Sequence, residues 1–168
     1  MAIVIIKLLI FTGARKSEIE SLTWQMVDFE GGYLRLPESK TGYKVIHLNA
    51  GALQVLNDYM PMKKSKFVFP AVKGIDYYEG TPKVWQNIRR QAKRENVRLH
   101  DLRHSFASIA VSGGASLPMI GALLGHKSTT TTQRYAHLQD DPLKVTNERV
   151  GDIPVSYTHL TLPTILLV

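Results

Sequence analysis

Three short clusters of basic, imidazole and phenol side chains stand out in the sequence as groups that could act on a phosphate. Arginine stays charged at physiological pH, and its forked donors match phosphate oxygens. A phenol can attack phosphorus once its proton is removed, and an imidazole can move such a proton. Together these groups are typical of phosphoryl transfer. They are Arg15 in the first cluster, His100 and Arg103 in the second, and His126 and Tyr135 in the third.

Each cluster has a less specific interpretation when it is taken alone. Arg15 could be a solvated surface residue or a partner of Glu18, one helical turn later. His100 and Arg103 are spaced to share one side of a helix start, where backbone N–H groups favour anions, but they could also be solvated polar residues. Nothing physical selects Tyr135 among the seven tyrosines. The order of the clusters therefore matters more than any one of them.

The composition indicates an anionic partner and excludes several kinds of site. The 168 residues include 21 Lys and Arg against 14 Asp and Glu, which gives a net charge of +7. Nucleic acid is the first candidate partner, followed by an anionic membrane or an acidic protein. There is no cysteine, which excludes disulfides, thiolate zinc sites and cysteine nucleophiles and favours the cytosol. The sequence also has no His-Glu-x-x-His helix, Walker loop or tight carboxylate cluster.

Hydrophobic periodicity and turn signals predict one domain that is mainly α-helical with a small antiparallel β-sheet, an α+β fold. The apolar start from Met1 to Phe11 is too short to span a membrane and is expected to form a core helix that ends at Gly13. Strands are expected on both sides of Ser-Lys40-Thr-Gly, with this lysine at the tip of a hairpin. The expected strands are Val27–Glu30, Tyr33–Leu36 and Lys44–Leu48.

Further helices are expected along the rest of the chain. The one from Thr81 to Asn96 would have an apolar side that includes Ala92 and a basic side. A later one would end at Gly113-Gly114 and turn toward the core its apolar residues Leu102, Phe106, Ile109 and Ala110. The other expected helices are Arg15–Leu22, Ala50–Tyr59 capped by Asn49, a helix from a Ser116 cap to Leu124, Thr129–Leu138 and Pro142–Val150.

In order along the chain, the clusters resemble the motifs of the tyrosine recombinases of the phage integrase family. Thr-Gly-Ala-Arg15-Lys-Ser-Glu-Ile resembles the first arginine box of that family. Lys40 in Ser-Lys-Thr-Gly resembles its β-hairpin lysine, and His100-Asp-Leu-Arg103-His-Ser-Phe-Ala resembles its second box.

Two more motifs complete the resemblance. Leu-Gly-His126 resembles a position at which the family has His or Trp, and Tyr135 in Gln-Arg-Tyr-Ala-His resembles the nucleophile. The similarity runs roughly from Met1 to Leu138. It implies that the chain has the catalytic-domain fold of that family, the fold of enzymes that break and rejoin DNA strands.

The resemblance implies that the chain cuts and rejoins DNA through a 3′-phosphotyrosine, with no metal or other cofactor. Arg15 and Arg103 would clamp the scissile phosphate and neutralise the charge of the transition state. Tyr135 would be the nucleophile. Glu18 would orient Arg15 or His100, and solvation of a helix surface is the alternative explanation for it.

The resemblance also implies proton donors and acceptors. Lys40 would protonate the departing 5′ oxygen, and Lys44 is the competing candidate because it lies on the same hairpin. His100 and His126 would hydrogen-bond the phosphate or shuttle the tyrosine proton. His104 and His137 are expected to be structural or to contact phosphate.

Double-stranded DNA is the expected partner, held through its backbone without sequence readout. The basic side of the Thr81–Asn96 helix is the main expected contact surface, and a merely solvated helix face is the alternative. The candidate DNA-binding residues are Lys44, Lys83, Arg89, Arg90, Lys93, Arg94, Lys127 and Arg134.

Domain organisation follows from the same resemblance. Residues 1–152 would be the catalytic domain, and the helical DNA-clamping domain that family members carry ahead of the first box would be missing. Asp140–Asp152 would be a docking arm exchanged between protomers of a homotetramer on DNA. Residues 153–168 would be a non-native tail, because the run that begins at Val155 resembles a translated sequencing adapter, with a real C-terminal strand as the alternative.

The function implied is site-specific DNA recombination or integration in a bacterial or phage-encoded cytoplasmic protein that does not bind membranes. A type IB topoisomerase, which shares the clamp and the tyrosine, is the nearest alternative. A DNA-binding fragment without catalysis and a metal-dependent phosphodiesterase built from the histidines are the others.

Overall fold

The computed structural model describes residues 1–39, 42–60, 65–74, 76–126 and 128–138, together with residues 147 and 151. The chain divides into two compact units, Met1–Leu138 and Gln139–Val168. Lys40, Lys127 and most of the second unit lie outside the described residues. The same is true of the expected helix Pro142–Val150 and docking arm, apart from residues 147 and 151, and of the tail 153–168.

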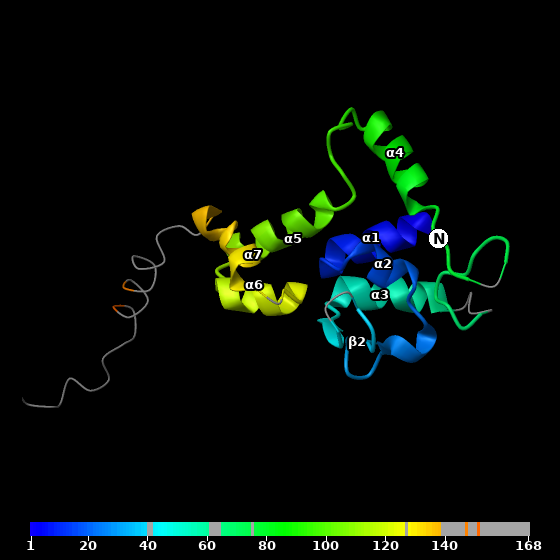
Figure 1. Ribbon diagram of the computed structural model, residues 1–168, viewed down its shortest axis with the longest axis horizontal. Coiled ribbons are helices and arrows are strands. Elements are labelled where there is room, and N and C mark those ends of the chain that lie inside the picture. The colour runs from blue at the N-terminus through cyan, green and yellow to red at the C-terminus, as the bar shows by residue number, and fades with distance from the viewer. Residues whose placement is uncertain are drawn as a thin grey trace, which may run out of the picture. The chain divides into compact units, whose positions relative to one another are not determined.

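The first unit is mainly helical with one small sheet, as predicted (Figure 1). Helix α1 (Ala2–Thr12) ends at Gly13, which has φ +62° and donates its N–H to the Leu9 carbonyl. Helix α2 (Lys16–Glu20) follows, and then the short 3-10 helix η1 (Trp24–Met26). Strands β1 (Val27–Asp28), β2 (Tyr33–Leu36) and β3 (Lys44–His47) form an antiparallel sheet in the order β1-β2-β3.

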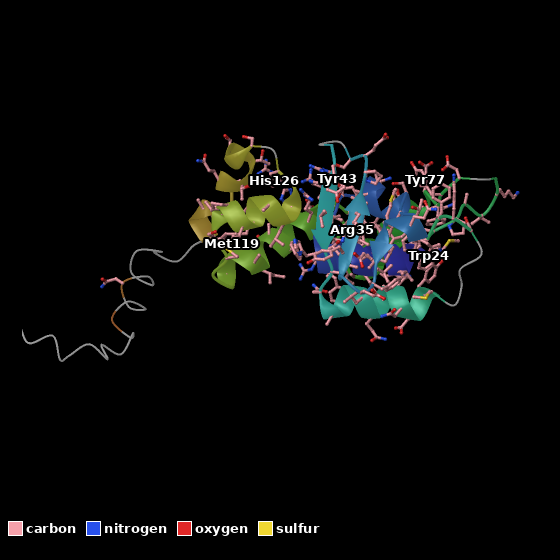
Figure 2. All side chains as sticks on the ribbon, turned by 90° about the horizontal axis from the view of Figure 1, so that it is seen from below. Trp24, Arg35, Tyr43, Tyr77, Met119 and His126 are labelled. Carbon is pink, nitrogen blue, oxygen red and sulfur yellow. The ribbon has the colours of Figure 1, made fainter. Side chains whose placement is uncertain are left out.

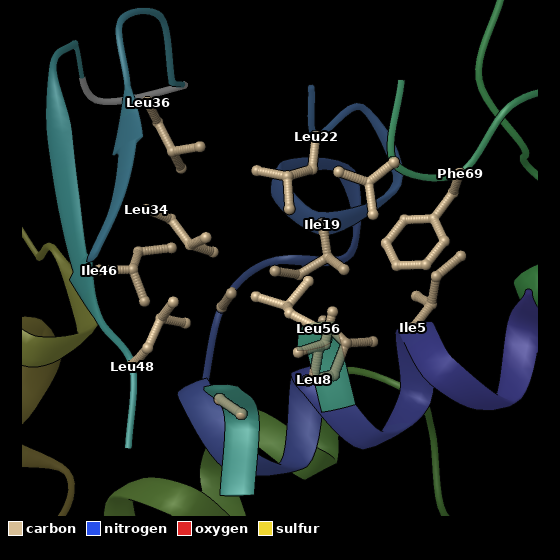
Figure 3. Packing of buried hydrophobic residues seen from close by; sticks show 14 of the residues in the cluster. Ile5, Leu8, Ile19, Leu22, Leu34, Leu36, Ile46, Leu48, Leu56 and Phe69 are labelled. Carbon is tan, nitrogen blue, oxygen red and sulfur yellow. The ribbon is translucent and has the colours of Figure 1, made fainter. Parts of the chain in front are cut away.

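The larger core lies between the sheet and the first helices. Strand β2 alternates, so that Leu34 and Leu36 are buried while Arg35 is exposed, and Leu34 pairs with Ile46 of β3. Figure 3 shows these side chains facing Ile19 and Leu22 from the region of α2 and Leu8 of α1. Helix α3 (Ala50–Tyr59) closes this core with Leu56, and the Asn49 side chain accepts the Ala52 N–H as the predicted cap.

Helix α4 (Thr81–Gln91) packs on α1. The remaining helices are α5 (Asp101–Ser112), α6 (Leu117–Leu124), α7 (Thr129–Gln133) and the 3-10 helix η3 (Ala136–Leu138), and they build a second, smaller core. The second core consists of Ala107, Val111, Ile120, Leu124 and Tyr135. Helix α5 also packs on α1, so the two cores are joined along it.

Two sequence predictions about helix faces were wrong. The helix from Thr81 ends at Gln91 rather than Asn96, because Lys93 has φ +53° and turns the chain, so Ala92 is exposed instead of packed. In α5, Ile109 is 73% exposed. Leu102, Phe106 and Ala110 pack against the two cores as predicted. The most buried residues of α5 are nevertheless Arg103, Ala107 and Val111, and Arg103 finds buried hydrogen-bond acceptors that a hydrophobic pattern does not reveal.

Two other features of the described residues bear on the sequence predictions. The segment expected as one helix from Thr129 to Leu138 is split into α7 and η3, and Tyr135 lies between them. No helix in the described part of the chain is long and apolar enough to cross a membrane.

We predict that Gly13→Ala is more destabilising than Gly74→Ala. Both glycines have positive φ, which costs about 1–2 kcal/mol for a residue with a Cβ. A Cβ at Gly13 would also lie 2.5 Å from Phe106 Cδ1 of α5, whereas nothing lies within 4 Å of one at Gly74. Urea unfolding should therefore show a loss of about 1 kcal/mol for Gly74→Ala and clearly more for Gly13→Ala. Equal losses would show that α1 and α5 are not in close contact at this point.

Candidate active site

The predicted catalytic residues within the described part of the chain line one small hollow. Its volume is about 180 Å³, and its walls come from the turn between α1 and α2, the start of α5, and α7 with the residues on either side of it. The lining is cationic and aromatic with several imidazoles, as a phosphate site requires. The lining residues are Arg15, His100, Arg103, His104, His126, Thr131, Arg134 and Tyr135.

Arg103 joins the three motif segments by two buried hydrogen bonds. Its side chain donates from Nη1 to the Gly13 carbonyl and from Nη2 to the Leu124 carbonyl, both at 2.7 Å. These carbonyls belong to the C-terminal ends of α1 and α6, where the helix dipole places negative partial charge. Burial, followed by the charge of Arg15, lowers the pKa of Arg103 to about 10, so the guanidinium stays charged at neutral pH.

Glu18 holds Arg15 at the edge of the hollow. One carboxylate oxygen accepts from Arg15 Nη1 and the other from the Arg15 backbone N–H, each at 2.8 Å. Lys44 Nζ, on strand β3, also donates to this carboxylate at 2.8 Å, and both side chains of that pair are 5% exposed. Burial alone raises the pKa of Glu18, but the bonds from Lys44 and Arg15 outweigh it and keep the pKa below its ordinary value of 4.5.

His126, which follows α6 (Figure 2), presents an imidazole that is neutral at physiological pH. Its Nδ1 lies 2.9 Å from the buried Thr132 hydroxyl of α7. Burial, and next the charges of Arg103 and Arg15, lower the pKa of His126 to about 4. The ring can therefore donate one hydrogen bond but carries no charge of its own at pH 7.

Tyr135 is 5% exposed and packs in the second core, with its hydroxyl group 2.6 Å from Nδ1 of His104. Burial raises the pKa of Tyr135, against the opposing charges of Arg134 and Arg103. His104 lies on α5, and its ring contacts that of His100 edge-on, with the centroids 5.1 Å apart. The phenol therefore needs a proton acceptor before it can react at neutral pH.

His100 is the residue that precedes α5, and its exposed ring reaches the rim of the hollow. Burial of part of the ring lowers the pKa of His100, and the neighbouring His104 and Arg103 lower it further. His100 and Arg103 thus lie on the same side of the helix start, as their spacing predicted.

Lys44 differs from the expectation that it contacts the DNA backbone. It is 6% exposed and its ammonium group is paired with Glu18, so it supports Arg15 from inside the protein. The strand pattern could not reveal this, because a lysine on a hairpin usually points to solvent. Lys40 and Lys127 lie outside the described residues.

The other candidate DNA-binding residues lie in three places. Arg134 lines the hollow beside Tyr135. Arg89 donates to the Val97 carbonyl at 3.4 Å and lines a separate hollow of about 590 Å³ with Trp85. The remaining cations are exposed on α4 or in the turn that follows it: Lys83, Arg90, Lys93 and Arg94.

Sequence reasoning gave too little weight to two residues of the hollow. His104 was assigned a structural or phosphate-contacting place, and Thr131 was not singled out. The available signal for His104 was its position one turn after His100 and next to Arg103, which puts it on the same side of α5. Among the described residues, no three His, Asp or Glu side chains are grouped so that they could hold a metal ion.

Comparison with protein families shows to which family the chain belongs. Residues 2–141 match the family model described as the phage integrase family. The chain belongs to the phage integrase family. The chain is similar to the tyrosine recombinase XerD of Pasteurella multocida, with 29% identity over 156 residues. It is also similar to the tyrosine recombinase XerA of Saccharolobus solfataricus, with 31% identity over 143 residues. These alignments cover 85% and 83% of this chain but 52% and 47% of the relatives, so the chain spans about half their length.

Solved structures show that the fold is that of phage integrase and tyrosine recombinase catalytic domains, as predicted. A crystal structure of the XerA recombinase superposes with a TM-score of 0.70 at 22% identity, over 89% of this chain and 56% of the other. The catalytic domain of bacteriophage HP1 integrase gives 0.64 at 22% identity, over 92% and 83%. The XerH recombinase in a post-cleavage complex with its difH substrate gives 0.71 at 23% identity, over 90% and 46%.

We predict that the two arginines of this phage integrase family site differ in their effect on stability. Arg103→Leu leaves two buried carbonyl groups without donors, each worth about 1–3 kcal/mol, so the free energy of unfolding should fall by at least about 3 kcal/mol. Arg15→Ala should cost about 1 kcal/mol, since Glu18 keeps Lys44. Urea unfolding of both variants measures the difference. Equal losses would show that Arg103 does not bridge α1 and α6.

We also predict a pH-dependent effect of Lys44→Met, which keeps the aliphatic packing and removes the ammonium group. At pH 7 the variant should lose about 2 kcal/mol of unfolding free energy, because Glu18 loses a charged partner. The lowered pKa of Glu18 means that its stabilising contribution is present above pH 4.5 and is lost as the pH falls through the folded-state pKa. The gap in unfolding free energy between wild type and Lys44→Met should therefore narrow as the pH falls below 4.5. Equal stability at pH 7 would show that the pair is not formed.

Proposed function

We propose that this chain catalyses site-specific DNA recombination or integration through a covalent 3′-phosphotyrosyl linkage at Tyr135. The supporting observation is that one hollow gathers two arginines, two of the predicted imidazoles and the phenol from segments that are up to 120 positions apart, Arg15 to Tyr135. Such a combination of groups suits attack on a phosphodiester, and packing alone does not require it.

The two guanidinium groups would hold the non-bridging oxygens of the scissile phosphate. Arg103 uses two of its five N–H groups on backbone carbonyls, so it is already oriented and has donors left for the phosphate. Arg15 is oriented in the same way by Glu18. Donors that are fixed in advance stabilise developing charge without reorganising during the reaction.

The proposed reaction exchanges one phosphate ester for another. The Tyr135 oxygen forms a bond to phosphorus, the bond from phosphorus to the 5′ oxygen breaks, and Lys40 protonates that departing oxygen. The reverse steps join a 5′ hydroxyl to the 3′ phosphate and release Tyr135. Since the phosphotyrosine keeps the bond energy, rejoining needs no ATP.

The imidazoles of His100 and His126 would donate hydrogen bonds to the phosphate. Both have lowered pKa values, so each offers a neutral ring at pH 7. For His126, a bond from the Thr132 hydroxyl to Nδ1 would leave the proton on Nε2, available to the hollow.

Double-stranded DNA is the proposed partner, and the positive surface is the proposed contact. The exposed cations of α4 and its following turn would bind backbone phosphates, and Arg134 would bind the scissile region. We also propose that the DNA-associated protein assembles as a tetramer through the segment Asp140–Asp152. The XerH structure, a recombinase bound to its difH substrate, supports DNA as the partner of a relative with this fold.

The decisive test is a nicked DNA substrate that traps the covalent intermediate. Wild type should form a protein-DNA band that survives denaturation, and Tyr135→Phe should form none. Arg15→Ala should form the band about 100- to 1,000-fold more slowly, because one preorganised donor is lost. Tyr77→Phe is the matched control, because it removes a phenol outside the hollow and keeps the ring that contacts Phe67.

The outcomes of this test separate the proposal from its alternatives. A band that persists in Tyr135→Phe would overturn the assignment of the nucleophile. DNA binding without any band would indicate a non-catalytic DNA-binding fragment. Relaxation of supercoiled plasmid that lacks any specific site would indicate a type IB topoisomerase instead of a recombinase.

A further inference from the structure

The hydroxyl group of Tyr135 is already hydrogen-bonded to an imidazole in this structure. Its oxygen lies 2.6 Å from Nδ1 of His104, within the range of a strong O–H···N contact, and the ring centroids are 6.0 Å apart. His104 comes from α5 and Tyr135 from the turn between α7 and η3, so tertiary packing and not local sequence makes this contact.

The other two imidazoles of the hollow contact groups other than the Tyr135 hydroxyl. Nδ1 of His126 faces the Thr132 hydroxyl, and the ring of His100 meets the edge of the His104 ring. Among the described side chains, His104 is the one that hydrogen-bonds the phenol of Tyr135. Proximity therefore favours His104 over His100 and His126 as the group that receives the tyrosine proton.

We propose that His104 is a catalytic residue that accepts the Tyr135 proton during strand cleavage and returns it during rejoining. This inference rests on the proposed function, in which Tyr135 attacks the scissile phosphate. The neutral ring would carry its proton on Nε2 and accept the phenol hydrogen at Nδ1.

The proton and the bonds balance in this step. As the Tyr135 oxygen bonds to phosphorus, its proton moves to Nδ1 of His104, and the departing 5′ oxygen takes a proton from Lys40. In rejoining, the 5′ hydroxyl returns its proton to the lysine as it attacks phosphorus. The released Tyr135 oxygen then recovers its proton from the His104 imidazolium.

The surroundings of His104 keep it in the accepting form. The groups that face it are Asp101 and Arg103 of α5, His100 and Arg98 ahead of α5, and Arg134 and Tyr135 from the segment after α7. Burial, and next the charge of Arg134, lower the pKa of His104 from 6.5, while Asp101 opposes them. The ring is therefore mostly neutral at pH 7, as a general base must be.

The position of His104 next to Arg103 gives the base and the phosphate clamp a common support. Arg103 is anchored on the ends of α1 and α6, and this fixes the start of α5. Any movement of α5 would carry both groups together, so the distance between base and phosphate would be kept.

The test compares His104→Ala and His104→Gln with wild type in the nicked-substrate assay as a function of pH. Wild type should be nearly independent of pH above about 7 and slow as the pH falls below the imidazole pKa. His104→Ala should be at least about 100-fold slower at pH 7 and gain about tenfold per pH unit, since hydroxide must then remove the proton. Added imidazole should accelerate His104→Ala but not wild type.

His104→Gln distinguishes proton transfer from positioning, because glutamine can hydrogen-bond the phenol but cannot take its proton. It should be as slow as His104→Ala. A wild-type rate in His104→Gln, or an unchanged pH profile with no imidazole rescue in His104→Ala, would overturn the proposal. His47→Ala, which removes an exposed imidazole on β3, is the matched control and should keep the wild-type rate.

The same experiment separates failure of this inference from failure of the proposed function. If wild type forms the Tyr135-dependent band and the His104 variants match it, only the role of His104 is wrong. If wild type forms no band, the proposed function fails and the role of His104 fails with it. Thermal unfolding of each variant checks that a slow rate does not come from loss of the fold.

Discussion

The Arg103 guanidinium is the contact on which the rest of the site depends. It lies buried between the Gly13 and Leu124 carbonyls, at the C-terminal ends of α1 and α6. A charge in this position would be costly without acceptors, and the two helix ends provide partial negative charge at the right distance. One side chain thereby joins the two hydrophobic cores and brings Arg15 and His126, which follow those helix ends, to the same hollow.

The second constraint is the concentration of positive charge. Glu18 is the acidic side chain that meets both Arg15 and Lys44, so one carboxylate offsets two cations behind the hollow. Burial lowers the pKa values of His100, His104 and His126, and the charge of Arg103 lowers all three further, which leaves neutral rings beside permanent cations. A phosphate would thus meet charge from arginine and hydrogen bonds from imidazole, two kinds of contact that respond differently to pH.

Elements that depend on local rules were well predicted from the sequence. The antiparallel hairpin, the Asn49 and Ser116 caps and the left-handed Gly13 all follow from residues close in the chain. On α5, the burial of Arg103 was not predicted, because it depends on acceptors supplied by α1 and α6, and Ile109 is exposed against expectation. The length of α4 was overestimated because a hydrophobic stripe carries no information on where Lys93 turns the chain.

The amino-acid sequence by itself determined the chemical groups and their order: two arginines, the imidazoles and a tyrosine in motifs that resemble one family. It could not say which groups touch, because a motif states spacing along the chain and not distance across the fold. Tertiary structure decided that Lys44 is buried against Glu18 and that His104 meets Tyr135. Both outcomes have the same physical reason: a side chain's partner is set by the helices and strands that pack around it, and these come from distant parts of the sequence.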